Sequence, residues 1–150
     1  MIAEAQVGHG DKALDYYLRI NPSNREKISD IHKCEPYVYA QTIAGKDAPS
    51  FGEAKNSWLT GTSAWNYVAI TQWILGIRAD YQGLIIDPVL PSDWDDFKIK
   101  RQFRDTIYKI DVVRSQFGQT QIMIDDQIFE GNMIPIIDDH DDVKVRIEIA

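Results

Sequence analysis

The chain has 150 residues, enough for one domain or two half-domains, and its 44% hydrophobic and 11% aromatic content favours a packed core over disorder. The formal net charge of -7 argues against a nucleic-acid backbone as partner. Residues 80–150 carry the whole excess, with 15 Asp and Glu against 8 Lys and Arg, whereas residues 1–79 have 8 of each and accommodate an anion site more easily.

Residues 1–7 are helical in composition from the first position, and no N-cap residue precedes them. This pattern favours a sequence truncated at its N-terminus over a frayed natural start. After a break at 8–10, Asp11 is predicted to cap a helix over 12–20.

Residues 21–34 are polar and are predicted to form a loop with a short turn of helix. Pro36 favours an extended Glu35, and a helix with mixed faces is predicted over 37–44. A loop over 45–57 follows.

The next helix is predicted over 64–75, capped by Thr62 or Ser63 and ended by Gly76. It is apolar almost all round, so we expect it to be deeply buried. The apolar stretch at 68–77 is too short to cross a membrane.

Beyond Arg78 the hydrophobic pattern changes to strands. Six strands are predicted, over 84–86, 97–103, 107–113, 121–124, 127–129 and 143–149. Tight turns are predicted at 104–106 and 125–126, and Trp94 and Phe97 are expected to fasten the sheet to the helices. Helices followed by an antiparallel meander predict the α+β class.

The strongest signal for chemistry is the segment 55–62, where a polar loop enters the apolar helix through Thr60, Gly61 and Thr62. Free backbone N–H groups, hydroxyls and the positive helix end then point at one place, which is an arrangement suited to phosphate. Gly61 would let the backbone approach a ligand closely. Ordinary capping by Thr60 or Thr62 explains the same residues, and the sequence leaves both interpretations open.

Aromatic residues are concentrated near this loop, and such rings either stack on sugars or pack between helices. They are Tyr37, Tyr39, Trp58, Trp65, Tyr67 and Trp73. Gln41 is expected to face the same cavity, which makes it the candidate sugar-binding residue.

No metal site is predicted, because His9, His32 and His140 lack zinc-ligand spacing and Cys34 has no partner. The acidic run 138–142 around His140 is interpreted as a solvated turn rather than a calcium loop. The lone Cys34 excludes an intrachain disulfide and fits a reducing compartment, and no signal peptide is visible, so we expect a cytoplasmic protein without membrane contacts.

Motifs over nearly the whole chain resemble those of the cellobiose and chitobiose phosphorylases, glycoside hydrolase family 94. The matching segments are 35–41, 45–49, 52–62, 65–67, 76–78, 83–84, 86–88 and 101–104. The resemblance implies the last helices of a truncated (α/α)6 catalytic barrel over 1–78, followed over 79–150 by an antiparallel β domain of sandwich or jelly-roll type.

The resemblance also implies an enzyme, a glycosyltransferase that cleaves a β-linked disaccharide of cellobiose or chitobiose type with inorganic phosphate and inverts the anomeric carbon. Phosphate is then a substrate and no cofactor is expected. Thr60 and Gly61 match the family's phosphate-binding pair, and Gln41 matches its glycone-binding glutamine. The general acid, an Asp, corresponds to no residue here and is expected upstream of Met1, so the chain alone should be inactive.

By this resemblance the partners are the disaccharide and phosphate. The full-length enzyme is either a homodimer or another oligomeric state, which the sequence does not decide. The alternative function is a non-catalytic α+β carbohydrate-binding or interaction module, which would need a complete core of its own.

Overall fold

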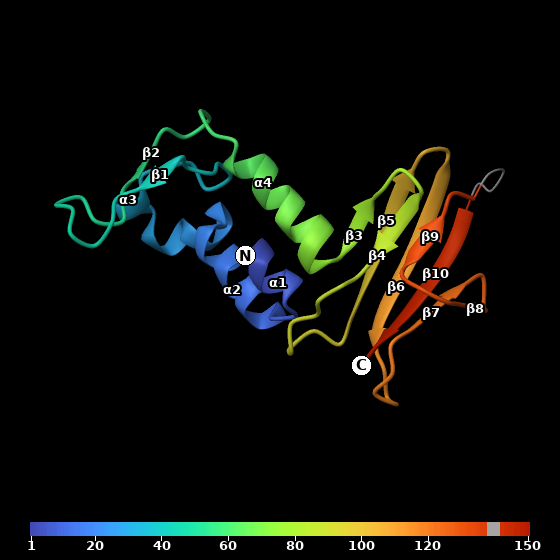
Figure 1. Cartoon of the computed structure of the whole chain (residues 1–150). Coiled ribbons are helices and arrows are strands. Elements are labelled where there is room, and N and C mark those ends of the chain that lie inside the picture. Colours follow the sequence, from blue (N-terminus) through green and yellow to red (C-terminus); the bar gives the residue numbers. More distant parts are fainter. Residues whose placement is uncertain (138–141) are drawn as a thin grey trace. The chain divides into compact units, whose positions relative to one another are not determined.

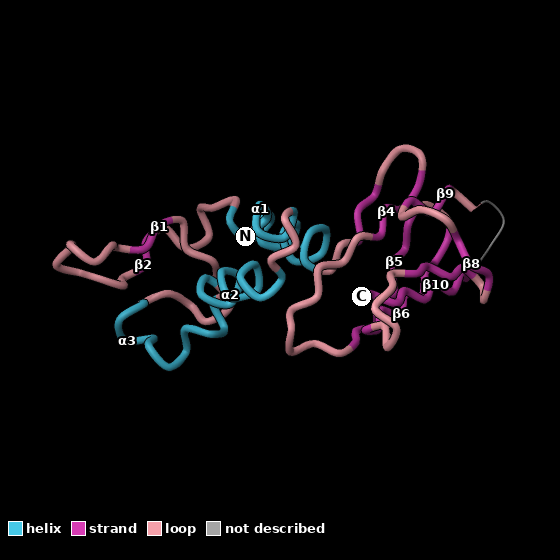
Figure 2. The backbone as a smooth tube through the Cα atoms, turned by 60° about the horizontal axis from the view of Figure 1, so that its bottom comes forward, coloured by secondary structure: helices cyan, strands magenta, loops and turns pink. Residues whose placement is uncertain are grey.

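The computed structural model describes residues 1–137 and 142–150. The chain divides into two compact units, Met1–Ile74 and Leu75–Ala150. The first holds the helices and one short hairpin, and the second is built from strands in its described part (Figures 1 and 2). This is the predicted α+β order. The division falls before the expected boundary at residue 78, because β3 (Ile77–Ala79) pairs with β4 (Gly83–Ile86) of the second unit.

The helical unit has a small core. α1 (Ile2–Gln6) and α2 (Gly10–Ile20) pack against each other and against η2 (Ala69–Ile74). Their contact buries Ala5, Ala13 and Ile74, with Met1, Tyr17, Ile70 and Trp73 partly buried around them. α2 begins at Gly10 with His9 as its N-cap. Asp11 therefore lies in the first turn and not at the predicted cap. There the positive end of the helix stabilises its carboxylate.

The predicted helix over 37–44 is wrong. The short helical stretch before it is present as η1 (Pro22–Ile28), a 3₁₀ helix, and α3 (Ser29–His32). Thr42–Ile43 then form β1, which pairs antiparallel with β2 (Ala54–Lys55). Two β-branched residues in succession favour the extended backbone, and the hairpin pairs backbone groups that a helix would have bonded locally.

The predicted helix over 64–75 is present but starts two residues earlier. It comprises α4 (Thr62–Val68), continued by η2 in the wider π-helical geometry. Deep burial is wrong for this chain, because Trp65 and Tyr67 are 67% and 61% exposed. The helix is buried on one side only, through Asn66, Ala69 and Ile74.

The β unit contains two sheets. The larger has the order β5-β6-β10-β7-β8 and the smaller the order β3-β4-β9. Their remaining strands are β5 (Asp96–Phe103), β6 (Thr106–Arg114), β7 (Gln121–Ile124), β8 (Gln127–Phe129), β9 (Met133–Pro135) and β10 (Asp142–Ile149). All six predicted strands lie within one residue of their predicted bounds. β3 and β9 were not predicted, and Pro135 is tolerated in β9 because that strand lies at a sheet edge.

The predicted meander is wrong in one respect, because β10 lies between β6 and β7 and runs parallel to β6. Val143, Val145 and Ile147 of β10 are all buried, and a central position gives this strand neighbours on both sides. The inner faces of the two sheets share one apolar core, which includes Leu84 of β4 and Ile110 of β6. The β unit therefore has a far larger core than the helical unit.

Two predicted turns are confirmed. Asp125 and Asp126 both have positive φ, 45° and 65°, and connect β7 to β8 as a two-residue hairpin. The other turn consists of Arg104 and Asp105, because Thr106 already pairs with Phe103 in the sheet.

Trp94 and Phe97 meet edge to face at 6.4 Å, and Phe97 packs on the sheet core. Their contact with the helices stays a prediction. Four residues of the acidic run, 138–141, lie outside the described residues. No helix of the described chain is long and apolar enough to cross a bilayer.

Candidate functional site

The loop between β2 and α4 has an unusual backbone. Asn56 and Trp58 adopt positive φ, 55° and 72°. Asn tolerates this conformation, but a bulky residue such as Trp seldom adopts it, and the strain amounts to about 1–3 kcal/mol. Such strain is concentrated at functional sites and needs surrounding contacts to hold it.

Two contacts hold Trp58. Its indole Nε1 donates to Glu35 Oε1 at 3.1 Å, and its ring meets Tyr37 edge to face at 6.2 Å. Hydrogen bonds from the Glu35 backbone N–H, Trp58 and Ser57 lower the pKa of the Glu35 carboxyl, so this acceptor is ionised at neutral pH. The segment before β1 thereby fixes the loop that leads to Thr60.

Thr60 lies where the loop enters α4. The Thr62 backbone N–H donates to Thr60 Oγ1 at 2.9 Å, and the two hydroxyl oxygens are 2.5 Å apart. Thr60 thus satisfies a free donor of the first turn, whereas Thr62 and Ser63 lie inside the helix and do not cap it. The hydroxyl pair has two hydrogens, of which one joins the oxygens, so the other can be donated to a ligand.

Gly61 is the N-cap of α4 but is not required by the geometry of the chain. Its φ of -80° suits any residue, and a Cβ placed there would meet only Trp65 Cδ1 at 3.9 Å. The fold of the described residues therefore accepts a side chain at this position. What the glycine provides is open space beside the Thr60 and Thr62 hydroxyls.

Gln41 contacts the same loop. Asn56 Nδ2 donates to Gln41 Oε1 at 2.9 Å, and the Gln41 backbone N–H donates to Lys55 O at 3.2 Å. Because Asn56 occupies the amide oxygen, Gln41 presents its Nε2 hydrogens to solvent or ligand. Gln41 does not lie on a helix, as the sequence predicted. It lies directly before β1 and contacts the loop through Asn56.

Two lysines beside β2 are paired with the same carboxylate. Lys33 Nζ lies 3.1 Å from Glu53 Oε2, and Lys55 bonds the other oxygen of the same carboxylate. These hydrogen bonds, that of Lys55 first, lower the pKa of Glu53 and keep it ionised. The groups that the structure places at Thr60 are neutral donors, the Thr60 and Thr62 hydroxyls.

The six aromatic residues divide into two groups. Trp73 packs against the small helical core, and burial with a hydrogen bond to Tyr17 raises the pKa of Tyr39 to about 12, so both have structural roles. Tyr37, Trp58, Trp65 and Tyr67 are exposed. Of the six rings, these four are exposed enough to contact a sugar or another part of the protein.

Acidification is expected to destabilise the helical unit through His32. Burial, followed by the charge of Arg25, lowers its pKa below the usual value, against a hydrogen bond with the Gly52 backbone. The folded chain thus binds this proton less tightly than the unfolded chain. The stabilisation is complete above a pH of about 6.5 and is lost as the pH falls through the folded pKa.

Urea unfolding at several pH values above about 5 measures the effect of His32, because carboxylates titrate below that range. The matched variant His32→Gln should show a flatter dependence on pH. An equal slope in both proteins would contradict the assignment.

Comparison with known proteins decides the family. Residues 1–76 match the model of the glycosyl hydrolase 94 superfamily, catalytic domain. The chain belongs to the glycosyl hydrolase 94 family. It is 44% identical over 111 residues to an N,N'-diacetylchitobiose phosphorylase of Vibrio proteolyticus, a match that covers 74% of this chain and 14% of that protein.

Two further relatives support the family 94 membership. The chain is 42% identical over 111 residues to an N,N'-diacetylchitobiose phosphorylase of Vibrio furnissii, covering 74% of this chain and 14% of the relative. It is 33% identical over 142 residues to a solabiose phosphorylase of Paenibacillus borealis, covering 93% of this chain and 18% of the relative. The chain thus spans less than a fifth of the length of these relatives.

Proposed function

We propose that this family 94 chain supplies part of the phosphate and glycone pocket of a disaccharide phosphorylase. In this proposal the protein cleaves a β-linked disaccharide with inorganic phosphate and inverts the anomeric carbon, giving an α-sugar 1-phosphate. The hydrogen bond between Asn56 and Gln41 carries the proposal, because it joins the candidate sugar residue to the loop of Thr60 and Gly61.

The proposed reaction needs a carboxylic acid that protonates the leaving oxygen while phosphate attacks from the opposite face of the sugar. Phosphate is already anionic and nucleophilic, so no general base is required. Thr60 donates a hydroxyl hydrogen to phosphate, and Gly61 leaves room for its close approach. The acid and the countercharge come from residues outside this chain, in keeping with the pairing of Lys33 and Lys55 with Glu53.

A chitobiose-type disaccharide is the substrate we propose first. The two relatives with the higher identities, 44% and 42%, are both named N,N'-diacetylchitobiose phosphorylases. Cellobiose is the second choice. A free-standing binding module is disfavoured, because the helical unit buries only a small core of Ala5, Ala13 and Ile74.

Thr60→Val in the full-length enzyme tests this function. The KM for phosphate should rise about tenfold or more, since the lost hydrogen bond to an anion is worth roughly 1.5–3 kcal/mol. The KM for the disaccharide should change little. Thr60→Ser keeps the hydroxyl and should restore the phosphate KM, which assigns the effect to the hydroxyl rather than to the methyl group.

Gly61→Ala provides a second measurement. Because a Cβ has room in this chain, the variant should fold as the parent does and still bind phosphate more weakly. An unchanged phosphate KM with a raised disaccharide KM in Thr60→Val would assign Thr60 to the sugar instead.

A further inference from the structure

The outer face of the larger sheet has three lysines in one row. Lys100 of β5 lies opposite Lys109 of β6, and Lys109 lies opposite Lys144 of β10. All three are exposed. Like charges directly opposite each other on neighbouring strands are destabilising, so a row of three reduces the stability of the sheet unless an anion lies over it.

The next row on the same face has the ordinary arrangement. There Asp111 lies between Lys98 and Arg146, at 3.3 Å from Lys98 Nζ and 3.9 Å from Arg146 Nη1. In the lysine row only Lys109 forms an ion pair within the described residues, with Asp142 at 2.7 Å, and the charge of Asp142 also acts on Lys100. Lys100 and Lys144 form no ion pair with any described residue.

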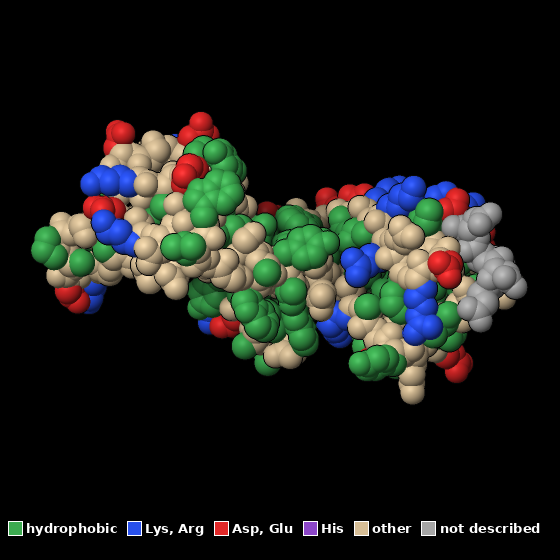
Figure 3. Space-filling model, turned by 90° about the horizontal axis from the view of Figure 1, so that it is seen from above, with side chains coloured by type: hydrophobic (Ala, Val, Ile, Leu, Met, Phe, Trp, Pro, Cys, Tyr) green, Lys and Arg blue, Asp and Glu red, His purple; other side chains and the backbone are tan. Residues whose placement is uncertain are grey.

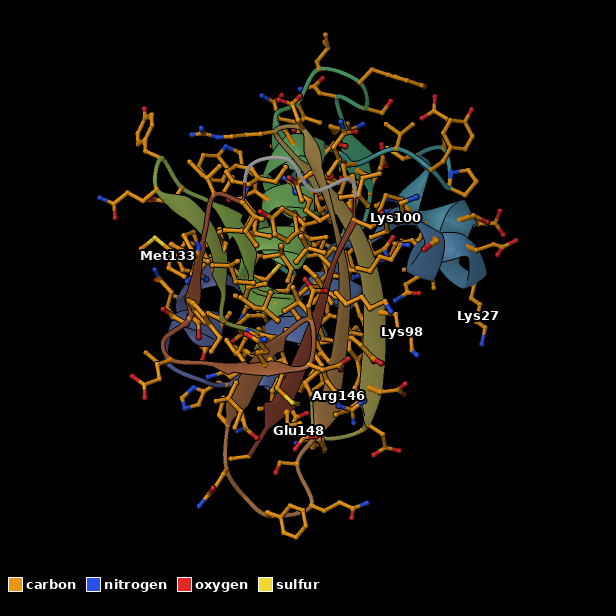
Figure 4. The ribbon with its side chains drawn as sticks, turned by 90° about the vertical axis from the view of Figure 1, so that its right-hand side faces the viewer. Lys27, Lys98, Lys100, Met133, Arg146 and Glu148 are labelled. Atoms are coloured by element: carbon orange, nitrogen blue, oxygen red, sulfur yellow. The ribbon has the colours of Figure 1, made fainter. Side chains whose placement is uncertain are left out.

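These rows line a groove of about 630 Å³. Figure 4 shows Lys98 and Lys100 on β5 and Arg146 on β10, and basic side chains are visible on the β unit in Figure 3. Among the described residues, five cations and two carboxylates line the groove, although the β unit as a whole has more Asp and Glu than Lys and Arg. No aromatic ring is among the lining residues that the structure describes, so these residues offer a neutral sugar nothing to stack on.

We propose that Lys100, Lys109 and Lys144 bind an oligophosphate group, meaning two or more linked phosphates on a small molecule. Neighbouring strands are about 4.8 Å apart, so the row spans roughly 10 Å. One phosphate contacts two adjacent lysines, whereas linked phosphates reach all three. Lysine ammonium groups act as point charges for phosphate and need no fixed fork geometry. The β unit as a whole has more Asp and Glu than Lys and Arg, and this net negative charge opposes a long polyanion such as nucleic acid.

The test is calorimetric titration of the 150-residue chain with tripolyphosphate, pyrophosphate and orthophosphate at constant ionic strength. Tripolyphosphate and pyrophosphate should bind about tenfold or more tightly than orthophosphate. Lys100→Gln and Lys144→Gln should each weaken the binding of tripolyphosphate about tenfold. Lys27 belongs to the helical unit, so Lys27→Gln should leave the affinity for tripolyphosphate unchanged. Equal affinities for the three anions, or no loss in the first two variants, would overturn the proposal.

A second measurement does not depend on calorimetry. Without added anion, Lys100→Gln should melt at or above the temperature of the parent, because it removes like-charge repulsion. Tripolyphosphate should raise the melting temperature of the parent more than that of the variant, which binds it more weakly. Equally tight binding of polyglutamate would show a general polyanion surface and would also overturn the oligophosphate assignment. Neither the binding affinity nor the melting temperature depends on phosphorolysis. Failure of this proposal can therefore be distinguished from failure of the proposed function.

Discussion

Gly83→Ala is expected to lower the stability of the β unit by about 3 kcal/mol, because the added methyl has no space. A Cβ at Gly83 would lie 2.0 Å from the backbone oxygen of Ile134 on the paired strand β9. Neither strand can move aside without separating Leu84 and Ile134, which are fully buried beside it. The loss is a large part of the roughly 5–15 kcal/mol that stabilises a domain.

Urea unfolding, followed by the circular dichroism of the strands, measures this loss of stability. Two further glycine variants serve as comparisons. Gly76→Ala should be as severe, since its Cβ would lie 2.1 Å from Asp87 O and its φ is +70°. Gly118→Ala also has a positive φ, +65°, but meets nothing within 4 Å, so it should lose only about 1–2 kcal/mol. If Gly83→Ala unfolded like Gly118→Ala, the close approach of β4 and β9 would be wrong.

The sequence predicted the strands better than their partners. Alternation in β10 places Val143, Val145 and Ile147 on one face, and the pair Asp125-Asp126 suits a hairpin with two positive φ angles. Alternation does not specify which strand lies alongside, so the parallel pairing of β10 with β6 was not predicted. Very short strands such as β1 and β9 have too few residues to show a period.

The candidate site residues stay a prediction, and the sequence did not indicate their geometry. Gln41 and the Thr60-Gly61 pair were singled out by local signals and by the family resemblance, whereas the hydrogen bond from Asn56 depends on a hairpin that the sequence did not indicate. The positive φ of Trp58 has no local signal, since a bulky residue adopts it only under tertiary contacts, here from Glu35 and Tyr37. Asn56 was the one detectable signal, because Asn tolerates the left-handed region.

The chain is expected to bind a hydrophobic dye and to self-associate through its helical unit. Trp58, Leu59 and Trp65 are 67%, 75% and 67% exposed, and hydrophobic side chains are visible on the surface of this unit (Figure 3). Leaving a few hundred Å² of apolar area uncovered forfeits several kcal/mol at about 25 cal/mol per Å². Large exposed apolar patches also drive association.

Dye fluorescence and light scattering on the whole chain and on residues 75–150 measure this difference. The β unit, with its larger core and excess of carboxylates, should remain monomeric and bind little dye. Trp65→Gln should reduce dye binding by the whole chain without lowering its melting temperature, because the side chain it removes is mostly outside the core. A monomeric, dye-negative parent with one sharp melt would show that the helical unit is self-sufficient, and would favour the non-catalytic module over the phosphorylase.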